Sequence, residues 1–102
     1  MSGLDQACAR ICAEIDGLAG IAGRVAPALL CARIDGIRRT ARDYGLHPVA
    51  DLAHALESAM AAGGARGLVG SYLDLMREAA RCGRTDREAS QIYLAAAQVR
   101  LN

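Results

Sequence analysis

Apolar side chains recur at three- and four-residue steps along most of this 102-residue chain. This spacing places them on one face of an α-helix, and no segment alternates polar and apolar residues for long enough to be a convincing β-strand. The 53% of hydrophobic residues come largely from alanine, leucine and isoleucine, with three tyrosines and neither phenylalanine nor tryptophan. Such small aliphatic side chains favour closely packed helices over sheets. We therefore expect an all-α fold.

Helix-capping signals divide this pattern into five helices. The first helix is expected from about residue 3 to about residue 18. The second has Pro27 in its first turn, or begins earlier near Ile21 with a kink at that proline, and ends at Gly45. Its expected inward stripe consists of Leu30, Ile34, Ile37, Ala41 and Tyr44. Pro48 opens the third helix, which is stopped by the glycine pair at 63–64.

A glycine and a capping box bound the last two helices. The fourth helix ends at Gly83, and Thr85 with Glu88 three places later forms a capping box that begins the fifth. The expected inward stripe of the fifth helix is Ala89, Ile92, Ala96 and Val99. A length of 102 residues and short connections indicate a single domain, residues 1–102, folded as an antiparallel four-helix bundle with an additional helix.

The charge balance argues against two classes of partner. Twelve basic and eleven acidic residues give a formal net charge of +1, so neither nucleic acid nor a membrane is an expected partner. No apolar run reaches the length of a membrane-spanning helix, and the N-terminus lacks the basic and then apolar layout of a signal peptide. We therefore expect a cytoplasmic protein.

Four cysteines, at positions 8, 12, 31 and 82, raise the question of a metal or redox site. No two of them have the C-x-x-C spacing typical of such sites, although Cys8 and Cys12 lie one helical turn apart and could form half of a metal site. The simpler interpretation is that they are buried free thiols, packed as small hydrophobes in a reducing compartment. No metal and no other cofactor is predicted.

The second predicted helix and the segment after it carry the most specific pattern in the chain. Residues 34–46 read IDGIRRTARDYGL and residues 49–57 read VADLAHALE. This pattern resembles the core signature of the histidine phosphotransfer (HPt) family, in which a histidine is followed by an apolar residue, a lysine, a glycine and, further on, a second glycine. Asp35 falls on the histidine, Ile37 on the apolar residue, Arg38 on the lysine, Arg39 on the near glycine and Gly45 on the distal glycine.

The resemblance implies a bundle in which an exposed histidine accepts a phosphoryl group from a receiver-domain aspartate and passes it on. Asp35 is a poor replacement, because a carboxylate is a weak nucleophile and phosphoryl-accepting aspartates normally lie in acidic pockets with a magnesium ion. We expect a degenerate, non-catalytic member that binds a receiver domain or a histidine kinase of a bacterial two-component system. The expected partner-binding surface is one exposed side of the second helix, formed by Asp35, Arg38, Arg39 and Arg42.

Other interpretations stay open at this point. The arginines could simply be the solvated face of an amphipathic helix. A second register of the motif runs through His54, with Gly64 ten places on, but it puts Glu57 where the family has lysine; His54 would then be the phosphoacceptor of an active phosphotransferase. In the first register we expect His54 to be a half-buried packing residue and His47 a loop residue. A structural helical module that forms dimers is the third alternative, so both a monomer and a homodimer are compatible with the sequence.

Overall fold

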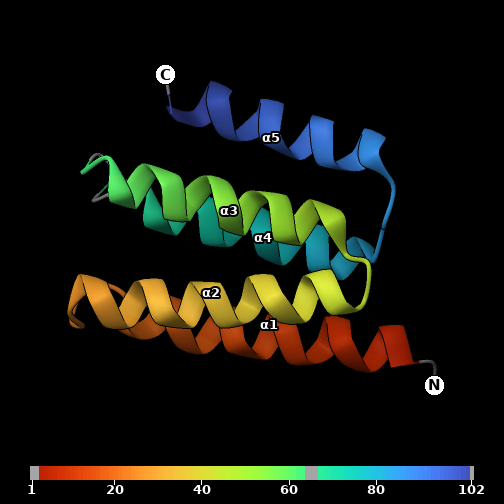
Figure 1. Cartoon of the computed structure of the whole chain (residues 1–102), viewed down its shortest axis with the longest axis horizontal. Helices are drawn as coiled ribbons and strands as arrows, with labels where there is room; N and C mark the ends of the chain where they lie inside the picture. The colour runs from red at the N-terminus through yellow and green to blue at the C-terminus, as the bar shows by residue number, and fades with distance from the viewer. Residues whose placement is uncertain (1–2, 64–66, 102) are drawn as a thin grey trace.

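The chain folds into five helices, with no strand in the part that the computed structural model describes, residues 3–63 and 67–101. Successive helices run in opposite directions, as Figure 1 shows. The predicted all-α bundle of antiparallel helices is confirmed. The helices are α1 (Gly3–Ile21), α2 (Pro27–Asp43), α3 (His47–Ala61), α4 (Val69–Cys82) and α5 (Arg87–Leu101).

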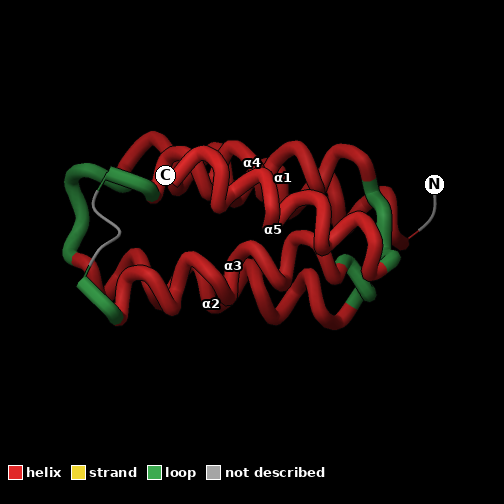
Figure 2. Tube along the Cα trace, turned by 90° about the horizontal axis from the view of Figure 1, so that it is seen from above, coloured by secondary structure: helices red, strands yellow, loops and turns green. Residues whose placement is uncertain are grey.

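Helices α1 to α4 form a closed four-helix bundle, and α5 lies on its outside. Both α2 and α4 pack against α1 and α3, so the four helices surround one core. Seen from above, α2 and α3 form one side of the bundle, whereas α1 and α4 form the other (Figure 2). The fifth helix covers α3 and, less extensively, α4. It runs in the same direction as α3, so the two helices begin at the same end of the molecule (Figure 1).

The apolar stripes of the first four helices provide the core, and Leu4, Cys8 and Met60 pack against it while only partly buried. Tyr44 was expected to point inward but is 48% exposed, because it follows the last residue of α2 at the surface of the turn. The glycines at 17 and 20 do not stop α1, which continues to Ile21. The largest buried side chains are Ile11, Ile15 and Leu18 of α1, Ile34 and Ile37 of α2, Leu46 just before α3, Val49, Leu52 and Leu56 of α3, and Leu73, Leu75 and Met76 of α4.

The connection between α2 and α3 fixes how these two helices face each other. Gly45 adopts a left-handed conformation with φ 72°, and its N–H donates to the carbonyl of Arg42 at 3.0 Å. The N–H of Leu46 donates to the carbonyl of Ala41 at 2.8 Å, and both of these side chains are buried. These bonds form a Schellman motif, which confirms Gly45 as the end of the helix. Because α3 begins at His47, this residue is helical and not the loop residue that we expected.

The predicted inward face of α5 was wrong at its two largest positions. Ala89 is buried, but Ile92 is 56% exposed and Val99 is 76% exposed. Apolar residues lie on more than one side of this helix. It packs against α3 and α4 through the buried Ala89, Ser90 and Ala97 and the partly buried Tyr93, Leu94 and Ala96. The start of α5 also differs, since Asp86, and not Thr85, accepts a hydrogen bond from the N–H of Ala89 at 3.1 Å.

The remaining predictions about helix ends have mixed outcomes. Gly63 (φ 82°) and Gly83 (φ 66°) end α3 and α4 in the left-handed conformation, as expected, whereas Gly64 lies outside the described residues. The second helix begins at Pro27, with no earlier kinked start. Within residues 3–63 and 67–101, none of the helices combines the length and the apolar character that crossing a lipid bilayer requires.

Candidate functional site

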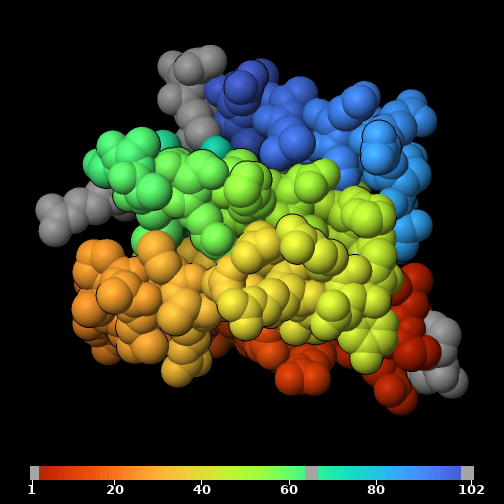
Figure 3. Space-filling view, viewed as in Figure 1, coloured from red at the N-terminus to blue at the C-terminus, as the bar shows by residue number. Residues whose placement is uncertain are grey.

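The candidate site lies where α2 runs beside α3 on the face shown in Figure 3, between α1 and α5. Because one face of α2 is buried in the core, the opposite face points outward. Asp35 and Arg39 lie on this outer face, one turn apart at positions i and i+4. Arg38 lies on the same side but closer to α3. The geometry of this helix therefore brings the predicted residues together as an ion-pair cluster.

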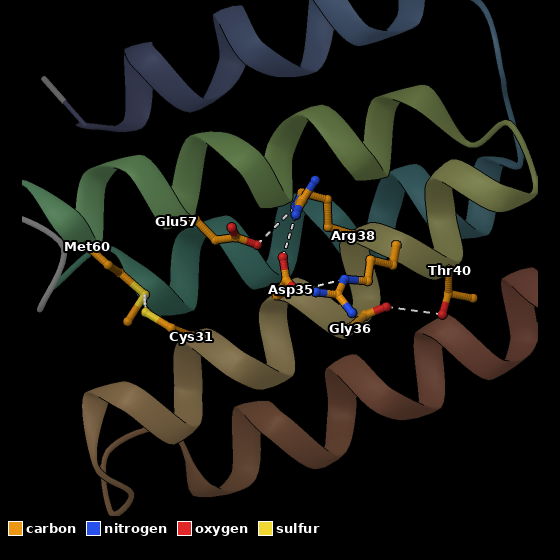
Figure 4. Close-up of polar contacts among 8 residues, drawn as sticks. Cys31, Asp35, Gly36, Arg38, Thr40, Glu57 and Met60 are labelled. Atoms are coloured by element: carbon orange, nitrogen blue, oxygen red, sulfur yellow. Dashed lines mark hydrogen bonds and ion pairs between the residues drawn. The ribbon is translucent and has the colours of Figure 1, made fainter.

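Asp35 is held by two guanidinium groups from its own helix. Its Oδ1 accepts a hydrogen bond from Nη2 of Arg38, and its Oδ2 forms an ion pair with Nε of Arg39 at 2.9 Å. Figure 4 shows the contact with Arg38, in which Asp35 and Arg38 point toward each other across the outer surface of α2. Each carboxylate oxygen thus has its own cationic partner.

Arg38 extends the cluster to the neighbouring helix. Its Nε donates a hydrogen bond to Oε1 of Glu57 in α3 at 3.3 Å, so one guanidinium joins two carboxylates on two helices (Figure 4). The side chains of Arg38, Asp35 and Glu57 are 18%, 26% and 24% exposed, whereas that of Arg39 is 74% exposed. The expectation that all four residues share one freely exposed side is therefore corrected: Asp35 and Arg38 lie half-buried beside α3, and Arg39 reaches into solvent.

The ion pairs set the charge state of Asp35. The hydrogen bond from Arg38 has the largest effect on the pKa of the Asp35 carboxyl, and it lowers this pKa. Partial desolvation raises the pKa, whereas the charges of Arg39 and Arg42 lower it further. The same hydrogen bond raises the pKa of Arg38. Asp35 is accordingly ionised at neutral pH, with both oxygens engaged. Such a carboxylate is poorly placed to attack phosphorus.

Arg42 and Thr40 complete the outer surface of α2. Arg42 is exposed in the last turn and forms no ion pair with any residue in the described ranges. Thr40 Oγ1 donates back to the carbonyl of Gly36 at 3.1 Å (Figure 4). A Cβ built on Gly36 would meet no atom of the described residues within 4 Å, so this part of α2 is open.

The two histidines lie on α3 and outside the cluster. His54 was expected to be half-buried, but it is exposed, because Leu52, Ala53 and Leu56 occupy the inward face of α3. His47 is exposed in the first turn of that helix. No group of three histidine, cysteine, aspartate or glutamate side chains in the described part of the chain could hold a metal ion.

All four cysteines are free thiols, and their burial differs. Cys8 and Cys12 are half-buried against the core, as is Cys31, whose Sγ lies 3.8 Å from Sδ of Met60 (Figure 4). Burial is the main cause that raises the pKa of the Cys8 and Cys12 thiols. Cys82 is exposed, which corrects the expectation that all four are buried, and its Sγ lies 3.2 Å from Oη of Tyr93.

Glu57 is the member of the cluster that the sequence did not assign to the α2 surface. Glu57 was considered only as the residue that stands at the lysine position of the His54 register. The short connection between the second and third helices nevertheless indicated its position. Two antiparallel helices joined by a short turn place the outer edge of one beside the outer edge of the next, so an arginine in α2 can reach an acid in α3. Comparisons of the chain with protein-family models, curated proteins and solved structures found no match.

Proposed function

We propose that this chain is a degenerate HPt-like signalling module, which binds a receiver domain or a histidine kinase of a bacterial two-component system without carrying phosphate. The resemblance places Asp35 where the family has its reactive histidine. The observation that carries the proposal is that both oxygens of this carboxylate are engaged by Arg38 and Arg39. The residue at the phosphoacceptor position therefore acts as a fixed charge and not as a nucleophile.

The partner-binding surface in this proposal is the outer side of α2 with the exposed parts of α3. Arg39 and Arg42 supply exposed positive charge, and the pocket around a receiver's phosphorylated aspartate is acidic. Arg39 also fills the space that the family leaves open with glycine, so docking would differ from that of a phosphate-transferring HPt domain. Occupying a receiver without accepting its phosphate would make this protein a sink or an antagonist.

Phosphotransfer and binding assays with purified receiver domains test this proposal. Phosphorylated receivers should leave the chain unlabelled, yet form a complex with it whose association slows when Arg42 is replaced by glutamate. Arg81→Glu is the matched control, because Arg81 is an exposed arginine on α4, far along the chain from the cluster. Stable labelling of the unmodified chain, or equal effects of the two replacements, would refute the proposal.

A second candidate function is active phosphotransfer through His54. The exposure of His54 favours it, and the ion pair of Glu57 with Arg38 offsets part of the negative charge one turn away. Acid-labile phosphate that is lost in His54→Gln but kept in His47→Gln would support this function. Label that persists in His54→Gln would exclude it.

A third candidate is a structural module that dimerises. The exposed side chains of Ile92 and Val99, seven residues apart on one side of α5, favour this function. Sedimentation at several concentrations, repeated with Val99→Glu, distinguishes a homodimer from a monomeric binding module.

A further inference from the structure

A polar pocket lies at the end of the molecule where α3 and α5 both begin, and its lining does not include the Asp35 cluster. It has a volume of about 350 Å³, at the small end of the range for ligand sites. The helices that form its walls start side by side in Figure 1. The lining residues are His47 and Asp51 from α3 and Arg87, Ser90, Gln91 and Leu94 from α5.

Ser90 is the feature that singles this pocket out. It is 4% exposed, and its Oγ has no hydrogen-bond partner among the residues that the structure describes. A buried hydroxyl without a partner destabilises a fold, and alanine would suit this position better, as it does at the neighbouring Ala89. Ser90 lines the pocket, and although its Oγ is shielded from solvent, a rotation about χ1 would let it donate the missing hydrogen bond to a ligand there.

The charged residues of the pocket face it from both helices. Arg87 contributes a guanidinium from α5 and Asp51 a carboxylate from α3, and neither forms an ion pair within residues 3–63 and 67–101. The nearby carboxylate of Asp86 is already engaged, because it pairs with Arg84 at 2.8 Å and caps α5. The pocket thus presents one free positive and one free negative group.

We infer that this pocket binds a small zwitterion of the α-amino-acid type. The ligand carboxylate would pair with Arg87 and accept a hydrogen bond from Ser90 Oγ, and the ligand ammonium would pair with Asp51. Leu94 provides an apolar wall for the ligand side chain, and His47 and Gln91 provide further polar contacts. A ligand with only a negative charge would be repelled by Asp51, and a ligand with only a positive charge would be repelled by Arg87. This inference does not depend on the proposed function of the α2 surface.

The first test is an NMR titration of the isotope-labelled full chain with L-leucine and two analogues that each lack one charge. The analogues are 4-methylpentanoate, without the ammonium, and 3-methylbutylamine, without the carboxylate. L-Leucine should produce saturable shifts at the amides of Asp51, Ser90 and Gln91. Each analogue should bind at least about tenfold more weakly, because it loses a charge-assisted pair. No saturable shift with L-leucine, or equal affinity for all three compounds, would overturn the inference.

Replacements in the pocket give the second test. Arg87→Gln and Asp51→Asn should each weaken leucine binding about tenfold, whereas Arg33→Gln, at an exposed arginine of α2, should leave it unchanged. Ser90→Ala should weaken binding and also raise the melting temperature, since it removes an unpartnered hydroxyl. Ser58→Ala, at an exposed serine of α3, measures the gain from helix propensity alone. A lower melting temperature for Ser90→Ala would show that the hydroxyl has a structural role, and would contradict the inference.

Discussion

Replacing Gly45 by alanine should destabilise the protein, whereas the same replacement at Gly36 should stabilise it. Gly45 has φ 72°, where a residue with a Cβ is less stable by about 1–2 kcal/mol. Gly36 lies inside α2 with ordinary helical geometry, where alanine is more favourable than glycine by about 1 kcal/mol. A Cβ built at either position meets no described atom within 4 Å, so neither effect is obscured by a collision. The two signs therefore follow from backbone conformation alone.

Urea unfolding followed by far-ultraviolet circular dichroism measures this difference. The two variants should differ by about 2–3 kcal/mol in the free energy of unfolding, which is the sum of the two backbone effects. Their slopes against urea concentration should be equal, because neither replacement changes the surface exposed on unfolding. In thermal scans each 1 kcal/mol corresponds to a shift of roughly 4–8 °C for a domain of this size.

Equal stabilities for the two variants would refute the reasoning. That result would mean that residue 45 does not adopt the left-handed conformation, and that the chain leaves α2 by another route. The Schellman turn at Gly45 sets the direction in which α3 returns along α2. Without it, the position of Glu57 beside Arg38 would lose its structural basis.

Three further measurements test other parts of the structure. Leu56→Ala, at a fully buried position of α3, should reduce the free energy of unfolding by about 2–5 kcal/mol. Ile92→Ala, on the exposed side of α5, should reduce it by less than about 1 kcal/mol. Equal losses in urea unfolding would show that α5 is packed differently. The lowered pKa of Asp35 means that its contribution to stability is present above its ordinary pKa of 3.8 and is lost as the pH falls through the folded value, so unfolding measured against pH should be less acid-sensitive in Asp35→Asn. The contact with Cys82 is the largest cause that raises the pKa of Tyr93 to about 12, so Cys82→Ala should move one tyrosine ionisation to lower pH in an ultraviolet titration, and an unchanged curve would contradict the contact.

The first four helices could be predicted from the sequence because each has a single apolar stripe. A glycine ends α2, α3 and α4 as expected, whereas the glycines at 17 and 20 do not stop α1. At Gly45 the local chemistry and the tertiary structure agree, since the same glycine ends α2 and directs the chain into α3. The face of α5 could not be predicted in this way. Ile92 and Val99 lie on one side of α5 and the buried Ser90 and Ala97 on another, and only the surface of α3 and α4 that the helix meets selects the side that is buried.

The candidate site could be predicted only within one helix. The spacing of Asp35, Arg38 and Arg39 follows from helical geometry, so their proximity was expected. The partial burial of Asp35 and Arg38 was not expected, because it depends on how closely α3 lies beside the outer face of α2. The orphaned hydroxyl of Ser90 was also beyond a sequence argument, since a serine in a helix gives no sign of whether its Oγ has a partner.

The proposed HPt resemblance sets a histidine against Asp35 and a glycine against Arg39, and these two differences are physically connected. An aspartate at position 35 would be a partly buried negative charge, and the arginine at position 39, where the family has glycine, forms an ion pair with it at 2.9 Å. Glycine at position 39 would leave Oδ2 of Asp35 without this partner, and a neutral histidine at position 35 would leave Arg39 without a carboxylate. The two residues therefore suit each other better than either suits the family pattern. This mutual fit supports the proposal that Asp35 and Arg39 form a stable, non-reactive ion pair.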